Sequence, residues 1–148
     1  AMAMGVAGLI VDQPDQRLGK LETRDMSLNF VVNPREPHFA GPVAILVDDL
    51  SMSTSEILAG GLQDLGRARV FGSPTPGAAL PSVIARLPSG DGFQYAFANY
   101  VSTGGETLEG RGVMPDVVVP PDRDALLEGE DPVIRAAVER IARERQKG

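Results

Sequence analysis

The most informative stretch of this chain reads Val43-Ala44-Ile45-Leu46-Val47-Asp48-Asp49-Leu50-Ser51-Met52-Ser53-Thr54-Ser55-Glu56-Ile57-Leu58. Its first five residues are continuously apolar, which is typical of a strand buried on both faces, as in a sheet covered by helices. After a polar turn, apolar residues recur at helical spacing as far as Leu65, and Gly66 then ends the predicted helix. The stretch therefore predicts a buried strand, a serine-rich turn and a helix.

Further strands and helices are predicted on both sides of this unit. The expected strands are 20–23, 27–32, 69–71, 82–87, 93–101 and 116–119, with 82–87 and 93–101 forming a hairpin. An apolar helix is expected over residues 1–11. A last helix opens at Asp131-Pro132, with Ile134, Val138 and Ile141 as its core stripe. Interleaved strands and helices indicate an α/β fold, with a core over residues 1–119 and a linker and C-terminal amphipathic helix over 120–148.

The composition of the 148 residues excludes several classes of protein. Hydrophobic residues make up 43 %, and 20 acidic against 14 basic side chains give a net charge of −6. This chain is too apolar for a disordered tail, and no run approaches the ~20 apolar residues of a membrane span. The acidic balance argues against nucleic acid as a partner. The absence of cysteine excludes disulfides and thiolate metal sites, and we expect neither a metal nor another cofactor.

Groups that can act as a general base near neutral pH are scarce in this sequence. It contains one histidine, His38, and two lysines, Lys20 and Lys147, while its arginines do not deprotonate in proteins. His38 lies in a proline-containing loop, where a histidine is usually solvated. A hydrolytic mechanism therefore requires His38, a carboxylate, one of the lysines, or a group that the chain does not contain.

Ser53 is the first candidate functional residue, and two interpretations of it stay open. A serine at a helix start is exposed beside unpaired N–H groups that can stabilise an oxyanion, as a hydrolase nucleophile requires. The run Ser53-Thr54-Ser55-Glu56 also fits the capping box, which stabilises a helix by about 1 kcal/mol and requires no catalysis. Glu109, beside Gly110, is on sequence grounds alone a turn residue.

Several segments resemble the C-terminal processing (tail-specific) serine peptidases, and in particular their tricorn-core-like branch. These segments are 42–47, 51–64, 66–72 and 110–116, the last reading Gly-Arg-Gly-Val-Met-Pro-Asp, and together they cover roughly residues 41–119. The resemblance implies a ββα spiral like that of the Clp protease and crotonase, in a single domain. The chain would be a C-terminal part of that catalytic core.

The resemblance also implies roles for single residues. Ser53 would be the nucleophile and Thr54 would supply an oxyanion-hole N–H. In one branch of the family a lysine acts as the base, and Ala78 stands in its place here, so that branch is rejected. Glu109 matches the glutamate of the other branch's Ser-His-Ser-Glu tetrad, whose histidine would lie before this chain. The substrate would lie along the loop 72–82, at Gly77, Ala78 and Ala79.

The expected function is therefore a serine peptidase that cleaves unfolded or C-terminal segments of proteins, in the bacterial envelope or secreted. Its base would come from a region absent here, so the isolated chain is expected to be inactive. A non-catalytic relative that binds a ligand or peptide, like the related retinoid-binding repeats, is the main alternative. A crotonase-like acyl-CoA enzyme is a weaker one, because it does not require the Ser-x-Ser-x-Ser-Glu motif. The apolar residues 1–11 offer a surface for a homo-oligomer.

Overall fold

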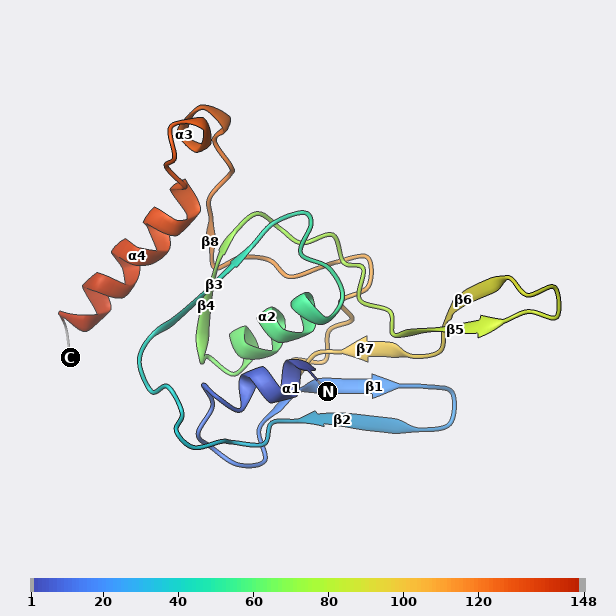
Figure 1. The fold of residues 1–148 in the computed structure, drawn as a ribbon. Coiled ribbons are helices and arrows are strands. Elements are labelled where there is room, and N and C mark those ends of the chain that lie inside the picture. Colours follow the sequence, from blue (N-terminus) through green and yellow to red (C-terminus); the bar gives the residue numbers. More distant parts are fainter. Residues whose placement is uncertain (1, 147–148) are drawn as a thin grey trace.

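The computed structural model describes residues 2–146, in which helices alternate with short strands (Figure 1). In chain order the elements are α1 (Met2–Ala7), β1 (Arg17–Glu22), β2 (Ser27–Val31), β3 (Val43–Val47), α2 (Thr54–Asp64), β4 (Ala68–Gly72), β5 (Ser82–Arg86), β6 (Gly92–Ala96), β7 (Asn99–Val101), β8 (Val117–Val118), α3 (Arg123–Leu127) and α4 (Pro132–Arg145). The α/β class expected from the sequence is confirmed. Within residues 2–146 no helix is long and apolar enough to cross a bilayer.

Two three-stranded sheets enclose α2, which occupies the centre of the molecule (Figure 1). One sheet is antiparallel in the order β2-β1-β7, and the other is parallel in the order β3-β4-β8. The parallel pairing aligns Val43 with Ala68 and Val47 with Gly72. Strands β5 and β6 pair only with each other, as a hairpin that projects from the body. The serine-rich turn thus lies at the carboxyl end of β3.

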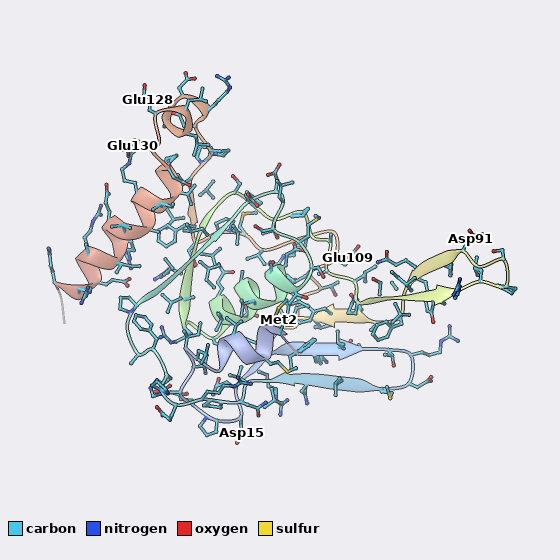
Figure 2. The ribbon with its side chains drawn as sticks, in the orientation of Figure 1. Met2, Asp15, Asp91, Glu109, Glu128 and Glu130 are labelled. Atoms are coloured by element: carbon cyan, nitrogen blue, oxygen red, sulfur yellow. The ribbon has the colours of Figure 1, made fainter. Side chains whose placement is uncertain are left out.

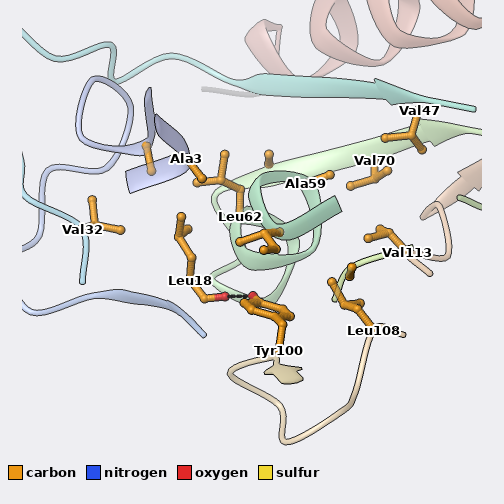
Figure 3. Close-up of a cluster of buried hydrophobic side chains, with 14 of the residues drawn as sticks. Ala3, Leu18, Val32, Val47, Ala59, Leu62, Val70, Tyr100, Leu108 and Val113 are labelled. Atoms are coloured by element: carbon orange, nitrogen blue, oxygen red, sulfur yellow. Dashed lines mark hydrogen bonds between the residues drawn. The ribbon is translucent and has the colours of Figure 1, made fainter. Parts of the chain in front are cut away.

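The core is built around the buried face of α2 (Figure 3). Leu62 of α2 packs with Leu18 of β1 and Val70 of β4, and all three side chains are buried. Tyr100 of β7 is also buried, and its hydroxyl donates a hydrogen bond to the Leu18 carbonyl. At Gly61 an added Cβ would lie 2.7 Å from the Leu18 Cβ, so glycine permits the close approach of α2 to β1.

Three sequence-based expectations about burial and pairing are wrong. Strand β3 is only partly buried, because it is an edge strand of its sheet, and Leu46 is 43 % exposed. The expected core stripe of α4 faces solvent, with Ile134 49 % and Val138 59 % exposed, because α4 packs mainly against β3 and β4 and buries Ala137 instead. The expected strand 93–101 is broken after β6, and β7 joins β1 in a different sheet.

The two ends of the chain also differ in detail from expectation. Helix α1 ends at Ala7, and Gly8 packs so closely on the Asn33 carbonyl that a Cβ there would clash. Its Ala3 and Ala7 are buried while Met2 and Val6 are exposed; Ala1 lies outside the described residues. The segment 120–130, expected as a linker, contains α3, whose N-terminus is capped by the Asp122 carboxylate. Asp131 caps α4 in the same way, as its position before Pro132 predicts.

Candidate active site

Ser53 connects β3 to α2 in an unusual backbone conformation. Its φ of 59° and ψ of −120° lie in a region that non-glycine residues rarely occupy and that costs about 1–3 kcal/mol. Two acceptors hold it there, because the Ser53 N–H donates to the Ala78 carbonyl at 3.1 Å and to Glu56 Oε2 at 3.0 Å. A strained serine at a strand-to-helix turn is how a hydrolase exposes its nucleophile.

The capping interpretation of Ser53 is only partly realised. The Ser53 hydroxyl and the Glu56 side chain are arranged as in a capping box, yet the hydroxyl makes no side-chain hydrogen bond to the helix N–H groups. The bonded half of the box is the Glu56 carboxylate, which accepts the Ser53 N–H. Ser53 is exposed, so its hydroxyl remains accessible to another reactant.

Thr54 opens α2, and its N–H has no acceptor among residues 2–146. Such unpaired N–H groups at a helix N-terminus point outward and carry the positive end of the helix dipole. An oxyanion that forms beside Ser53 would meet this donor first. The position expected from the resemblance is therefore electrostatically suited to an oxyanion-hole N–H.

Glu56 is the central polar residue of the site, and its side chain is fully buried. Besides the Ser53 N–H, its carboxylate accepts the Thr75 hydroxyl at 2.5 Å, the Gly77 N–H at 2.8 Å and the Ala78 N–H at 3.0 Å. These four donors compensate the loss of hydration of a buried charge. Glu56 thus joins the turn at Ser53 to the loop 75–78, a role that the capping-box pattern did not predict.

Glu109 lies on the opposite side of the same loop, between α2 and the root of the β5–β6 hairpin (Figure 2). Its Oε2 accepts the Ala79 N–H at 2.8 Å and the Leu80 N–H at 3.1 Å. Since Ser53 bonds Ala78 and Glu109 bonds Ala79, the two candidate catalytic residues contact adjacent residues of one loop. The structure therefore brings them to the same site.

Close backbone packing fixes the turn that carries Glu109. Gly110 donates to the Gly77 carbonyl at 2.8 Å, and Val113 donates to the Thr75 hydroxyl at 2.7 Å. Gly112, with φ +72°, lies so near the Thr75 carbonyl that any side chain there would clash. The Gly-Arg-Gly-Val segment is thus the structural partner of loop 75–77.

The other titratable candidates lie elsewhere. The His38 ring bonds Glu36 at 3.0 Å, and the segment 33–41 is held at the C-terminal end of α2, where Arg67 donates to the carbonyls of Phe39 and Gly41. The 11 residues of α2 separate that end from Ser53 by about 16 Å. Lys20 forms an ion pair with Glu22 on β1, and Lys147 lies outside the described residues. Among residues 2–146, neither His38 nor Lys20 bonds Ser53.

A pocket of about 300 Å³ opens beside the candidate nucleophile. Apart from the two site residues Ser53 and Thr54, its lining is apolar and comes from α1, β1, β2, α2 and the loop before β5: Met2, Ala3, Leu21, Phe30, Ile57, Ala79 and Pro81. Of the three residues expected to contact substrate, Ala79 lines this pocket, Ala78 is exposed beside Ser53, and Gly77 is buried against the Glu109 turn.

A slightly larger hollow, of about 330 Å³, lies at the carboxyl ends of β3 and β4 and shares no lining residue with this pocket. Two of its polar side chains serve local structure, because Asp131 caps α4 and Asp48 accepts the Ser51 hydroxyl.

A strained serine between strand and helix, with an unpaired helix N–H and an apolar pocket beside it, is an arrangement typical of serine hydrolases. The comparison with known sequences makes this specific. The chain belongs to Peptidase family S41, whose sequence profile matches residues 3–119. It is 40 % identical over 85 residues to the carboxyl-terminal-processing protease of Picosynechococcus sp., an alignment that covers 57 % of this chain and 20 % of that protein.

Solved structures with a similar fold include two proteases. The photosystem II D1 C-terminal processing protease matches with a TM-score of 0.70 and 28 % identity, over 80 % of this chain and 30 % of that one. The tricorn protease shares the fold, with a TM-score of 0.69 and 22 % identity over 94 % of this chain and 13 % of that one. The chain thus spans about a fifth of the first curated relative and less than a third of either structure.

Proposed function

We propose that this chain carries the nucleophile of a serine peptidase of the C-terminal-processing type, in the tricorn-core-like branch of the family. The Ser53 hydroxyl attacks the carbonyl carbon of a peptide bond, and the Thr54 N–H donates to the oxyanion that forms. The observation that carries the proposal is the strained backbone of Ser53, with its hydroxyl left unbonded by the helix it begins.

The general base of this reaction comes from outside the 148 residues. A serine hydroxyl is a weak nucleophile until a base takes its proton. His38 and Lys20 are engaged elsewhere, and Ala78 stands beside Ser53 without a titratable group. Glu109 uses Oε2 on the loop, which leaves Oε1 for the orienting serine of a Ser-His-Ser-Glu tetrad.

A second oxyanion donor must also come from elsewhere. The N–H groups of residues 77–80 lie nearest to Ser53 along the loop, but all four are bonded to Glu56 or Glu109. The Thr54 N–H, which has no acceptor among residues 2–146, remains for the oxyanion. The chain therefore provides the nucleophile and one donor of a site that another segment completes.

The substrate is an extended, apolar segment of an unfolded or C-terminal protein region. The pocket beside Ser53 accepts an apolar side chain, because Leu21, Phe30 and Ile57 form its walls. Such segments are exposed only in unfolded chains or at chain ends.

By analogy with the relatives we also propose an envelope or secreted location. A homo-oligomer through α1, whose Met2 and Val6 are exposed, is a further proposal that sedimentation at two concentrations tests.

A fluorophosphonate probe, applied to the parent polypeptide that contains this chain, tests the proposed function. We expect covalent labelling at Ser53, and Ser53→Ala is expected to abolish it. Ser51→Ala and Ser55→Ala are matched controls from the same motif and are expected to retain labelling. Labelling at either control serine contradicts the assignment of the nucleophile, and no labelling at all favours a non-catalytic, peptide-binding member of the family.

A further inference from the structure

We infer that Glu109 is a positioning residue that fixes the wall of the Ser53 pocket through the backbone of residues 79 and 80. This inference rests on the proposed function only where it concerns substrate. Its basis is geometric: one carboxylate oxygen receives two successive N–H groups, at 2.8 and 3.1 Å, from a loop far away in the sequence. Hydrogen bonds to a carboxylate are about twice as strong as neutral ones.

The loop depends on such external acceptors. Pro74, Pro76 and Pro81 interrupt it, and it forms no strand or helix between Ser73 and Pro81. Its four successive N–H groups, from residues 77 to 80, are divided between two carboxylates, with Glu56 taking the first two and Glu109 the last two. Because Glu56 belongs to α2 and Glu109 to the turn before Gly110, the loop is held from two sides.

The part that Glu109 holds is the part that a substrate would contact. Ala79 and Pro81 line the pocket beside Ser53, and β5 begins at the next residue, Ser82. The hairpin has no other strand partner, and this loop is one of its two connections to the body, the other being the short link to β7. Loss of the Glu109 bonds would move one wall of the pocket while Ser53 remains held by Glu56. The effect should fall on substrate binding more than on the chemical step.

Amide hydrogen exchange of the 148-residue chain tests the positioning role without any need for activity. In Glu109→Ala, exchange at Ala79 and Leu80 is expected to rise about tenfold or more, as for the loss of a charged hydrogen bond. Exchange at Gly77 and Ala78 should stay unchanged. Glu109→Gln keeps an acceptor oxygen and should restore most of the protection. Glu106→Ala, which removes a nearby carboxylate paired with Arg111 at 3.1 Å, is the control. Unchanged exchange at Ala79 and Leu80 in Glu109→Ala would overturn the inference.

Kinetics of the active parent polypeptide then separate positioning from charge relay. We expect Glu109→Ala to raise KM for a peptide with an apolar residue before the cleaved bond, with a smaller change in kcat, and Glu109→Gln to restore KM. If Glu109→Ala lowers kcat but leaves KM unchanged, Glu109 acts in the relay alone and the positioning role is overturned. If the parent shows no activity but exchange responds as expected, the proposed function fails and the positioning of the loop stands.

Discussion

Ser53 holds a backbone conformation that glycine adopts with less strain, and this gives a direct test of the elbow geometry. Ser53→Gly is expected to be more stable than Ser53→Ala by about 1 kcal/mol, because alanine keeps the strained positive φ. Ser53→Ala itself should cost little, since the hydroxyl makes no capping hydrogen bond. Urea unfolding of the three proteins measures the difference. Equal stability of the alanine and glycine variants would show that the positive φ at position 53 does not strain the backbone.

Glu56 links the nucleophile turn to the loop through four hydrogen bonds, so its charge should matter for stability. Glu56→Gln replaces one acceptor oxygen by an NH₂ group that faces N–H donors. We expect a loss of about 2–4 kcal/mol in the free energy of unfolding. Thermal denaturation measures it against Glu106→Gln, which alters an exposed carboxylate and should be nearly silent. Equal stability of the two variants would show that the Glu56 contacts contribute little.

The junction of β7 with β1 contains a buried tyrosine that should make stability depend on alkaline pH. Burial, and secondarily the charge of Asp64, raise the pKa of Tyr100 well above its ordinary value of about 10. Above that pH the unfolded chain releases the phenolic proton while the folded chain retains it. The stability contributed by Tyr100 is therefore complete below pH ~10 and declines above it, by about 1.4 kcal/mol per pH unit.

Urea denaturation between pH 8 and pH 11 measures this decline. Tyr100→Phe is expected to remove the Tyr100 contribution to the slope. At neutral pH it should cost about 1 kcal/mol, for the hydrogen bond to the Leu18 carbonyl. Tyr95→Phe, at an exposed position on the β5–β6 hairpin, is the control and should keep the slope. If the free energy of unfolding of Tyr100→Phe declines with pH as steeply as that of the unsubstituted chain, groups other than Tyr100 cause the decline.

Elements whose pattern is local were predictable from the sequence, and those that depend on a distant partner were not. The strand, turn and helix over 43–65 follow from a contiguous pattern that needs no tertiary information. The choice of β1 as the partner of β7 does not, because nothing within residues 93–101 indicates that the strand breaks and that its second part joins another sheet. The periodicity of α4 shows which face is apolar but not whether anything covers it.

The same distinction between local and distant features holds for the candidate site. Motif resemblance brought Ser53, Thr54 and Glu109 together, and the structure supports their proximity. The carboxylate contacts of Glu56 were not predictable, because its partners Gly77 and Ala78 lie 21 and 22 residues away and donate through their backbones. Almost any residue type can donate a backbone N–H, so the sequence does not show which residues do so. The sequence therefore indicated the candidate nucleophile, but not the contacts that hold the loop beside it.

The 148 residues as a unit are expected to be unreactive. In the proposed mechanism the base and the second oxyanion donor both come from outside the part of the chain that the structure describes. Loss of the base alone costs orders of magnitude, and loss of a donor adds about 10²–10³. We expect no labelling of the isolated chain by a fluorophosphonate probe, measured by intact mass. Efficient labelling at Ser53 would contradict this and would require His38 to approach, which its position at the far end of α2 opposes.

The isolated chain also offers a gain-of-function experiment. Ala78 is exposed, and its carbonyl accepts the Ser53 N–H at 3.1 Å, so a side chain at position 78 begins next to the nucleophile. Ala78→Lys would place an amine within reach of the Ser53 hydroxyl, and a positioned general base contributes about 10²–10⁴ in rate. We therefore expect the probe to label Ser53 about 10² times faster in Ala78→Lys than in the unsubstituted 148-residue chain. This ratio should increase as the pH rises, because the amine then loses its proton. Ala78→Met has similar length without a base and should stay unreactive. Equal labelling of the lysine and methionine variants would show that the missing oxyanion donor, and not the missing base, limits this site.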